Sequence, residues 1–199
     1  MILNTGLKNL PQTKRNLEVV NYIKLLYNSD MKKIYYTWQD IENQTQEILR
    51  QIQQDAWVPD YVVGLTRGGL VPANLISQYL EIPMETLKVQ LRDGAESESN
   101  LWMAEDAFGY NREIPKNILI VDDINDSGAT LNWIKQDWQS SCLPNEDHWK
   151  YVWGSNVRVA TLVDNESSAS ELNVSYTAIG LNKAEEDLWI VFPWEDWWK

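Results

Sequence analysis

The alternation of short apolar runs with stretches of helical character constrains the fold of this chain most strongly. Apolar or β-branched runs occupy residues 60–65, 84–91, 117–123, 157–163 and 174–180. Stretches of helical character lie at 37–52, before the first of these runs, and at 70–80 and 130–138, between later ones. Strands that alternate with helices form a parallel sheet covered on both faces. The sequence therefore predicts an α/β fold, and ligands of such sheets bind beyond the carboxyl ends of the strands.

A capping box marks the start of the first predicted helix. Thr37 occupies the N-cap position and Asp40 follows three residues later, just after a short predicted strand in "KKIYY". One stripe of the helix is apolar, and it consists of Ile41, Ile48, Leu49 and Ile52. We expect residues 1–30 to be an N-terminal extension and residues 31–199 to form the main domain.

Residues 92–113 interrupt the pattern. They are polar, contain two glycines and show little periodicity. An irregular segment of this length is unusual in a compact domain, and is typical of a mobile lid or of an ordered excursion. We expect a flexible loop that closes over the site and excludes water.

Charge and composition exclude several kinds of partner. The 199-residue chain has 17 basic and 29 acidic residues, for a net charge of −12, and no basic stripe compensates. Binding to nucleic acid or to a membrane surface is therefore not expected. The chain has no apolar stretch of membrane-spanning length and no secretory signal, so we expect a cytoplasmic protein.

The single cysteine and the single histidine point away from thiol and zinc chemistry. One cysteine cannot form an internal disulfide, which is consistent with a reducing compartment. Cys142 and His148 lie in a predicted loop around Pro144, and we expect them to be unrelated surface residues.

The densest cluster of chemical groups is "IVDDINDSGAT", residues 120–130. Gly128 can adopt backbone angles that are closed to other residues, so successive N–H groups can form a nest at the N-terminus of the next helix. Ser127 and Thr130 add hydroxyl donors, which together make a cradle for one phosphate. The preceding Asp122 and Asp123 can accept hydroxyls of a sugar or hold hydrated Mg²⁺. A ribose 5-phosphate fits this pattern; the alternative is that the aspartates are ordinary caps and turn residues.

A second loop, "TRGG", follows the strand at 60–65. Arg67 can donate two parallel hydrogen bonds to a phosphate, and Gly68 and Gly69 leave the backbone open. Arg-Gly-Gly after a strand is also a common turn, so this pattern by itself is weak. Its place at a predicted strand end makes it a candidate for binding pyrophosphate.

The string "ILIVDDINDSGAT" resembles the motif with which type I phosphoribosyltransferases bind phosphoribosyl pyrophosphate (PRPP). The resemblance implies a parallel-sheet core flanked by helices, with Mg²⁺ as cofactor. Asp122 and Asp123 would contact the ribose hydroxyls and the metal, and the acid at position 126 would lie near the base and transfer a proton. The PRPP-binding residues would be Asp122, Asp123, Asp126, Ser127, Gly128, Ala129 and Thr130.

Two further strings narrow the resemblance to bacterial xanthine-guanine phosphoribosyltransferases. "GLTRGGLVPA" resembles their pyrophosphate loop, which implies a pyrophosphate site at Thr66, Arg67, Gly68 and Gly69, with a Thr66–Arg67 peptide that can be cis. The C-terminal "DLWIVFPWEDWW" resembles their base-binding hood, here about residues 181–199. The resemblance implies that Trp189 stacks on the base and that main-chain groups near Ile190 read its edge. Trp197 and Trp198 fit a packed hood or a subunit interface better.

Two departures leave the base open. Purine relatives place a lysine after the strand that corresponds to 157–163, whereas our alignment puts Asp164 there. An ionised carboxylate would favour an exocyclic amino group rather than an oxo group. Residues 92–113 also lack the Ser-Tyr pair that many relatives carry on the flexible loop.

The sequence thus predicts a Mg²⁺-dependent enzyme that transfers phosphoribosyl from PRPP to a purine-like base, giving a nucleoside 5′-monophosphate and pyrophosphate. Relatives are homodimers or homotetramers, and we expect the same here. Two alternatives remain at this point. One is a non-catalytic regulator that binds PRPP or a nucleotide on the same fold. The other is an unrelated hydrolase or phosphatase, which would leave the arginine loop and Trp189 unexplained.

Overall fold

The computed structural model describes residues 32–89, 100–110, 114–186, 188–195 and 197–198. It separates the chain into two compact units. The larger runs from Thr37 to Glu185, and the smaller combines the segment before Thr37 with the segment from Glu186 onward.

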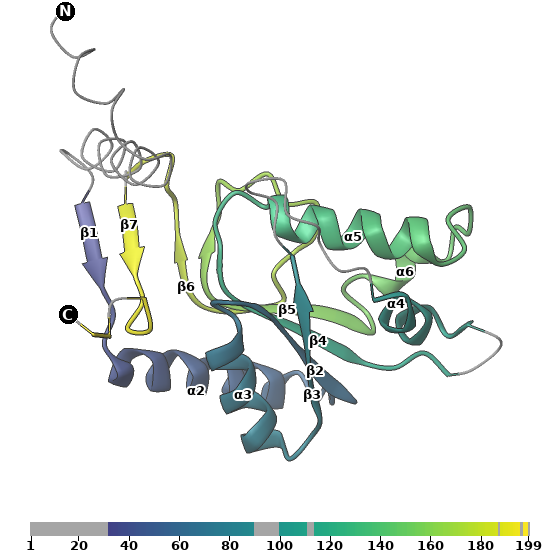
Figure 1. Cartoon of the computed structure of the whole chain (residues 1–199), viewed down its shortest axis with the longest axis horizontal. Coiled ribbons are helices and arrows are strands. Elements are labelled where there is room, and N and C mark those ends of the chain that lie inside the picture. The colour runs from purple at the N-terminus through teal and green to yellow at the C-terminus, as the bar shows by residue number, and fades with distance from the viewer. Residues whose placement is uncertain (1–31, 90–99, 111–113, 187, 196, 199) are drawn as a thin grey trace, which may run out of the picture. The chain divides into compact units, whose positions relative to one another are not determined.

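A five-stranded sheet forms the centre of the larger unit (Figure 1). All its neighbouring strands are parallel, and their order is β3-β2-β4-β5-β6. Each strand corresponds to a predicted apolar run: β2 Tyr61–Thr66, β3 Met84–Lys88, β4 Ile118–Asn125, β5 Val157–Asn165 and β6 Tyr176–Leu181. The prediction of a parallel sheet is confirmed.

Helices cover both faces of this sheet, as Figure 1 shows for α2 and α3 against α4, α5 and α6. Their bounds are α2 Trp38–Gln54, α3 Leu70–Leu80, α4 Leu101–Phe108, α5 Ala129–Ser141 and α6 Trp149–Val152. The predicted capping box of α2 is present, since Thr37 and Asp40 exchange hydrogen bonds in both directions. The predicted apolar stripe of α2 is buried throughout.

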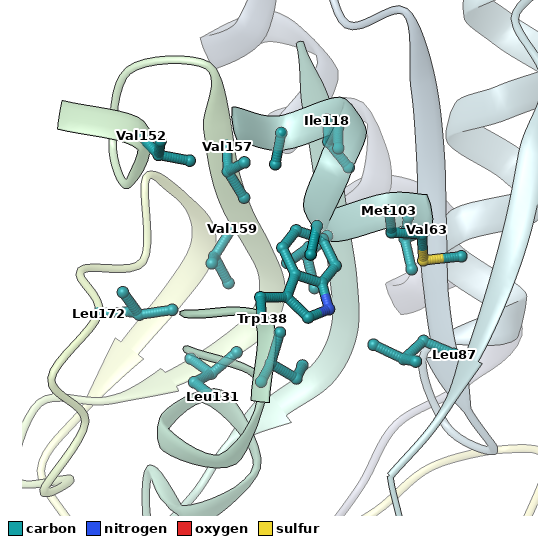
Figure 2. Packing of buried hydrophobic residues seen from close by; sticks show 14 of the residues in the cluster. Val63, Leu87, Met103, Ile118, Leu131, Trp138, Val152, Val157, Val159 and Leu172 are labelled. Atoms are coloured by element: carbon teal, nitrogen blue, oxygen red, sulfur yellow. The ribbon is translucent and has the colours of Figure 1, made fainter. Parts of the chain in front are cut away.

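The core on the α5 side is built around one tryptophan. Trp138 is fully buried and lies among aliphatic side chains of the sheet and of α4 (Figure 2). Successive residues of a strand face opposite sides, so Val63 joins this core while Val62 is buried on the other face. Burial on both faces explains why the central strands read as continuous apolar runs.

Two expectations about the larger unit are wrong. The segment 92–113 is not irregular throughout, because residues 101–108 form α4 and bury Met103, Ala104 and Ala107 in the core. This apolar face is short and partly made of alanine, so it gave little periodic signal. Cys142 is not a surface residue: it is 3% exposed and belongs to the same core, whereas His148 is exposed. Residues 92–99 and 111–113 of the predicted loop lie outside the described residues.

The smaller unit contains a two-stranded parallel sheet. β1 Lys32–Tyr35, the strand predicted at "KKIYY", pairs with β7 Leu188–Val191. Trp189 is 43% exposed, while its neighbours Leu188 and Ile190 are buried. The expected hood was placed at about 181–199, but Leu181 still belongs to β6 of the larger sheet. None of the helices in the described part of the chain has the length and apolar composition needed to cross a membrane.

Candidate active site

The site is built at the carboxyl ends of β2 and β4, which are neighbours in the sheet. Residues 66–69, here called the arginine loop, leave β2. Asp122 and Asp123 lie near the end of β4, and residues 126–130, here called the phosphate loop, lead from β4 into α5. Because parallel strands end at the same edge, two loops that are 60 residues apart in sequence share one end of the sheet.

The arginine loop packs directly against the carboxylates of β4. A Cβ atom on Gly68 would overlap the carboxylate of Asp123, and one on Gly69 would overlap the carbonyl oxygen of Val121. Glycine at both positions therefore permits the close approach of the loop to the strand end. Any side chain here would push the loop away from Asp123.

Arg67 is free to bind a ligand as far as the described residues show. Its side chain is exposed, and the guanidinium group makes no hydrogen bond or ion pair with the described residues. The Thr66–Arg67 peptide is cis, as the resemblance implied. An exposed guanidinium beside open backbone is suited to binding a phosphate group.

The phosphate loop encloses a small cavity of about 120 Å³. Gly128 has φ +83° and precedes α5, whose first backbone N–H groups have no partner within the helix. These N–H groups and the helix dipole favour an anion at this end. The residues around the cavity are Asp122, Ile124, Asn125, Asp126, Ser127, Gly128, Ala129, Thr130, Leu131 and Thr161.

Asp122 and Asp123 form a half-buried acidic pair that lacks a cationic partner among the described residues. The backbone N–H of Asp123 donates to Asp122 Oδ1 at 3.0 Å, and that of Ile124 donates to Asp123 Oδ1 at 2.9 Å. Burial raises the pKa of Asp122, and the adjacent Asp123 charge raises it further; burial also raises the pKa of Asp123. Without ligand, burial thus opposes the expected ionised state.

The donor set of this pair suits a magnesium ion. No cluster of three or more metal-ligating side chains occurs in the described segments. Mg²⁺, however, is commonly held by one or two carboxylates, with water and substrate phosphates completing its coordination. Two neighbouring carboxylates that lack a cation, beside a loop suited to phosphates, match that mode of binding.

Three residues of this end of the sheet gave no useful signal in the sequence. Thr161 pairs in register with Asp122, lines the cavity, and is fully buried with a hydroxyl that has no partner in the described structure. A single threonine within a strand does not stand out. Asn165 and Lys183 are the other two, and they contact the phosphate loop.

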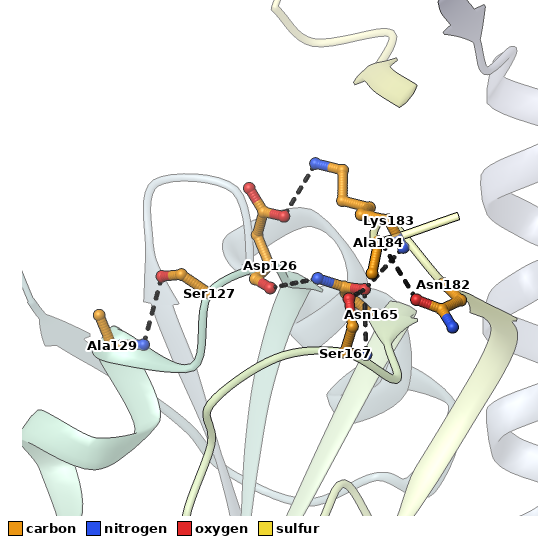
Figure 3. A network of polar contacts seen from close by, with 8 residues as sticks. All are labelled: Asp126, Ser127, Ala129, Asn165, Ser167, Asn182, Lys183 and Ala184. Atoms are coloured by element: carbon orange, nitrogen blue, oxygen red, sulfur yellow. Dashed lines mark hydrogen bonds and ion pairs between the residues drawn. The ribbon is translucent and has the colours of Figure 1, made fainter. Parts of the chain in front are cut away.

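Asn165 and Lys183 hold Asp126 from two sides (Figure 3). Asn165 Nδ2 donates to the carbonyl oxygen of Asp126 at 2.7 Å, and Lys183 Nζ lies 2.8 Å from Asp126 Oδ1. Asn165 is 6% exposed, and its Oδ1 also accepts from the backbone N–H of Lys183 at 3.0 Å. One buried amide therefore fixes both the phosphate loop and the loop after β6.

Asp164 does not stand free in the place expected for a lysine that contacts the base. Its Oδ1 accepts from Asn125 Nδ2 at 2.8 Å, and the same amide donates to Ser168 Oγ at 2.9 Å. These contacts tie Asp164 to its paired position on β4.

The larger unit thus brings together the predicted residues of both loops and the acidic pair. Trp189 and Ile190, the predicted base-binding residues, belong to the smaller unit, and their role stays a prediction. A parallel α/β sheet that ends in an arginine loop, two half-buried carboxylates and a small cavity at a helix N-terminus defines a protein suited to a phosphorylated sugar.

The sequence profile described as "Phosphoribosyl transferase domain" matches residues 31–195, so the chain belongs to this family. Hypoxanthine-guanine phosphoribosyltransferase of Schizosaccharomyces pombe is 24% identical over 189 residues, covering 83% of this chain and 90% of that protein. Xanthine-guanine phosphoribosyltransferase of Idiomarina loihiensis is 26% identical over 165 residues, covering 82% of this chain and 88% of that protein.

Comparison with solved structures supports the same fold. A purine phosphoribosyltransferase from Pyrococcus horikoshii matches with a TM-score of 0.57 at 23% identity, covering 82% of this chain and 95% of that one. The predicted family, the fold of the type I phosphoribosyltransferases and the enzyme class are therefore confirmed.

Proposed function

We propose that the protein transfers phosphoribosyl from PRPP to a purine-like base in a Mg²⁺-dependent reaction, releasing pyrophosphate and a nucleoside 5′-monophosphate. One observation supports this most strongly: Gly68 brings the arginine loop against Asp123, directly beside the cavity of the phosphate loop. The site can thus contact both phosphorylated ends of PRPP while carboxylates lie between them.

The phosphate loop would bind the 5-phosphate of PRPP. Backbone N–H groups at the start of α5, with the hydroxyls of Ser127 and Thr130, supply donors without a fixed positive charge. Asp122 and Asp123 would accept the ribose hydroxyls and hold the metal. When bound, Mg²⁺ would neutralise negative charge that develops on the departing pyrophosphate.

Arg67 would bind the pyrophosphate group from the other side. Its exposed guanidinium has no partner in the described chain, so binding would break no internal contact. As the C1–O bond to pyrophosphate lengthens, positive charge develops on the ribose and negative charge on the leaving group. The guanidinium of Arg67 would stabilise the negative charge on the departing pyrophosphate.

Asp126 would accept the proton that the base loses as its ring nitrogen bonds to C1 of the ribose. The names of the relatives, which refer to hypoxanthine, xanthine and guanine, support a purine as the base.

Trp189 would stack on the base, and such stacking contributes about 1–3 kcal/mol. Trp189→Ala is therefore expected to raise the KM for the base alone, and an unchanged KM would remove Trp189 from the site.

The test is an assay of pyrophosphate release with PRPP, Mg²⁺ and a panel of purine and pyrimidine bases. The proposal expects release that needs both PRPP and a base. Binding of PRPP without release for any base would indicate a regulator instead. Release of inorganic phosphate would indicate a phosphatase.

The cellular and quaternary settings belong to this proposal as well. We propose a cytoplasmic enzyme that acts as a homodimer or homotetramer, as the resemblance implies. Light scattering of the purified protein would determine the subunit number.

A further inference from the structure

A second cavity lies in the larger unit, at the opposite end of β5 from the phosphate loop. Its volume is about 380 Å³, within the range of about 300–1,000 Å³ that is typical of small-molecule sites. Val157 and Val159, at the amino end of β5, line it together with Leu172, and all three belong to the core shown in Figure 2. The polar side chains around it are Lys135, Gln139, Lys150, Trp153, Glu171 and Asn173.

The charge of this cavity is opposite in sign to that of the whole protein. Two lysines and one glutamate line it, whereas the chain carries a net charge of −12. The amide groups of Gln139 and Asn173 add further hydrogen-bond donors. A local excess of positive charge in an acidic protein favours an anionic ligand.

Two donors around the cavity are available to such a ligand. The indole N–H of Trp153 is buried and has no hydrogen-bond partner within the described chain. The side chain of Lys150 is 57% exposed, and its ion pair with Asp147 is long, with 3.9 Å between Nζ and Oδ2. Binding a ligand would therefore cost neither group a short hydrogen bond.

Lys135, the second lysine, connects the cavity to residues 169–172, here called the bridging segment. Its ammonium group lies 2.8 Å from Glu171 Oε2. Asn132, three residues earlier on α5, accepts from the N–H of Glu171 at 2.6 Å and donates to the carbonyl oxygen of Ala169 at 2.9 Å. These three contacts attach the bridging segment to α5.

The bridging segment also touches the phosphate loop. The N–H of Ala169 donates to the carbonyl oxygen of Ser127 at 3.1 Å. A Cβ on Gly128 would lie 2.3 Å from the backbone nitrogen of Ser170, so the two segments are in direct contact. The last two residues of the segment line the cavity. Four consecutive residues therefore reach from the cavity to the phosphate loop.

We propose that this cavity is a regulatory site for a nucleoside monophosphate, and that its occupation weakens the binding of PRPP. The phosphate, with up to two negative charges and three acceptor oxygens, would bind Lys135 and Lys150. The base would lie against the apolar side formed by Val157, Val159 and Leu172.

The bridging segment would carry the effect to the phosphate loop. The bound phosphate would compete with Glu171 for Lys135, because it carries more charge than a carboxylate and repels one. The segment would then lose one of its three contacts with α5, which would loosen its hold on the phosphate loop. This effect on PRPP rests on the proposed function, whereas binding of the nucleotide does not.

Binding is tested by nuclear magnetic resonance of the tryptophan indole groups in the ¹⁵N-labelled protein, with AMP, GMP and UMP as probes. Trp153→Phe identifies the Trp153 signal. We expect each nucleotide to shift this signal, because the indole N–H gains an acceptor. Adenosine and ribose 5-phosphate each carry one half of the ligand, and should bind at least about 10-fold more weakly than AMP.

Lys150→Met removes one ammonium group from the cavity. The affinity for AMP, measured at the Trp153 signal, should fall about 10–100-fold, as is typical for the loss of a hydrogen bond to a charged group. Lys116→Met is the matched control. The side chain of Lys116 is 48% exposed, forms an ion pair of 3.0 Å with Asp106 and does not line the cavity. This variant should bind AMP like the wild type.

The effect on PRPP is measured as the KM for PRPP in pyrophosphate release, at increasing concentrations of AMP. An exposed ion pair contributes little, so saturating AMP should raise this KM only about 2–5-fold. Glu171→Gln should raise it by a similar factor without AMP. Direct competition of AMP for the PRPP site would persist unchanged in Lys150→Met, whereas the effect through the cavity should need about 10–100-fold more AMP in that variant.

Three results would overturn the inference. No shift of the Trp153 signal with any of the three nucleotides would exclude the site. Equal binding of ribose 5-phosphate and AMP would indicate a site for phosphate alone. An unchanged KM for PRPP, or a rise that is the same in Lys150→Met, would exclude the regulation.

Failure of the proposed function would be seen separately, as the absence of pyrophosphate release with every base. The Trp153 signal would still decide whether the cavity binds a nucleotide. Calorimetric titration with PRPP, with and without saturating AMP, would then decide whether the two sites are coupled, because linkage requires each ligand to weaken the other by the same factor.

Discussion

The two loops of the site are held in place in different ways. The arginine loop is shaped by missing side chains, since Gly68 and Gly69 lie where a Cβ would overlap β4, and its one long side chain is exposed. The phosphate loop is held by polar contacts, with Asn165 on its backbone and Lys183 on Asp126. The position of the arginine loop thus depends on packing alone. The position of the phosphate loop depends on hydrogen bonds as well as on packing, since a Cβ on Gly128 would overlap the backbone of Ser170.

This difference implies different responses to substitution. The arginine loop should respond to changes of volume only, whereas the phosphate loop should respond to a change of polarity at constant volume as well. The following substitutions test that contrast, beginning with the largest expected effect.

Asp126→Asn keeps the volume of the side chain and removes its ability to accept a proton. General base catalysis contributes roughly 10²–10⁴-fold, so we expect kcat to fall by that order. Binding of PRPP should be nearly unchanged, because Asn165 holds the carbonyl oxygen of residue 126 rather than its side chain. Pyrophosphate release and calorimetric titration with PRPP measure the two quantities. A parallel loss of turnover and PRPP binding would contradict the assigned role.

Gly68→Ala adds one methyl group at the closest approach of the two chain segments. The added Cβ would overlap the carboxylate of Asp123, so the arginine loop must move away from β4. A displacement of about 1 Å costs about 10²-fold in rate at a well-positioned site, and we expect a loss of this order in kcat/KM for PRPP. Gly154→Ala is the control, since a Cβ there meets no atom within 4 Å. Its positive φ should cost some stability but leave kcat/KM in place. Full activity of Gly68→Ala would show that the contact does not position the loop.

Arg67→Ala tests the free side chain of the same loop. Hydrogen bonds to charged groups contribute about 1.5–3 kcal/mol, so the affinity for PRPP and for pyrophosphate should fall roughly 10–100-fold. Binding of the free base should not change. Arg67→Lys keeps the charge but lacks the planar guanidinium, so its affinity for PRPP should lie between those of the wild type and of Arg67→Ala. Stability should be unaffected, since the described structure gives the side chain of Arg67 no internal partner. If base binding weakened as much as PRPP binding, Arg67 would have a different role.

The same contrast explains how much of the site could be predicted. The arginine loop and the phosphate loop each follow an apolar strand within a few residues, so the local sequence pattern was enough to predict them. The same is true of the Thr37 cap and of the strands. The Asp126–Lys183 contact joins residues 57 positions apart. It depends on how the loop after β6 reaches the phosphate loop, which no local pattern contains. Asn165 stands in no ligand-binding motif of the sequence, because its burial and the four hydrogen bonds of its side chain result from tertiary structure.

The regions that sequence reasoning missed have a common cause. α4 has an apolar face of three residues, two of them alanine, which is too short to produce a periodic signal. The pairing of β1 with β7 joins segments near opposite ends of the chain. Both depend on partners distant in sequence, and hydrophobic period alone reports only which face of a segment is buried.

Asp122, located between the two loops, tests whether the site is maintained at the expense of stability. Burial and the charge of Asp123 raise its pKa above the ordinary carboxyl value of 3.8. The folded protein therefore binds this proton more tightly than the unfolded chain does. The stabilisation that results is complete below pH 3.8 and is lost as the pH rises through the raised pKa.

At pH 7 and without PRPP or Mg²⁺, Asp122→Asn should thus increase the free energy of unfolding, because it removes a partly desolvated charge next to a second one. An increase on the order of 1 kcal/mol corresponds to about 2–4 °C in Tm for a domain of this size. The gain should disappear as the pH approaches 4, where the wild-type carboxyl is protonated as well, and activity with PRPP should be lost at every pH. Thermal unfolding at both pH values measures the effect, with Glu146→Gln as an exposed control. A lower Tm of Asp122→Asn at pH 7 would mean that the Asp122 carboxylate stabilises the fold, and that function and stability do not compete at this strand end.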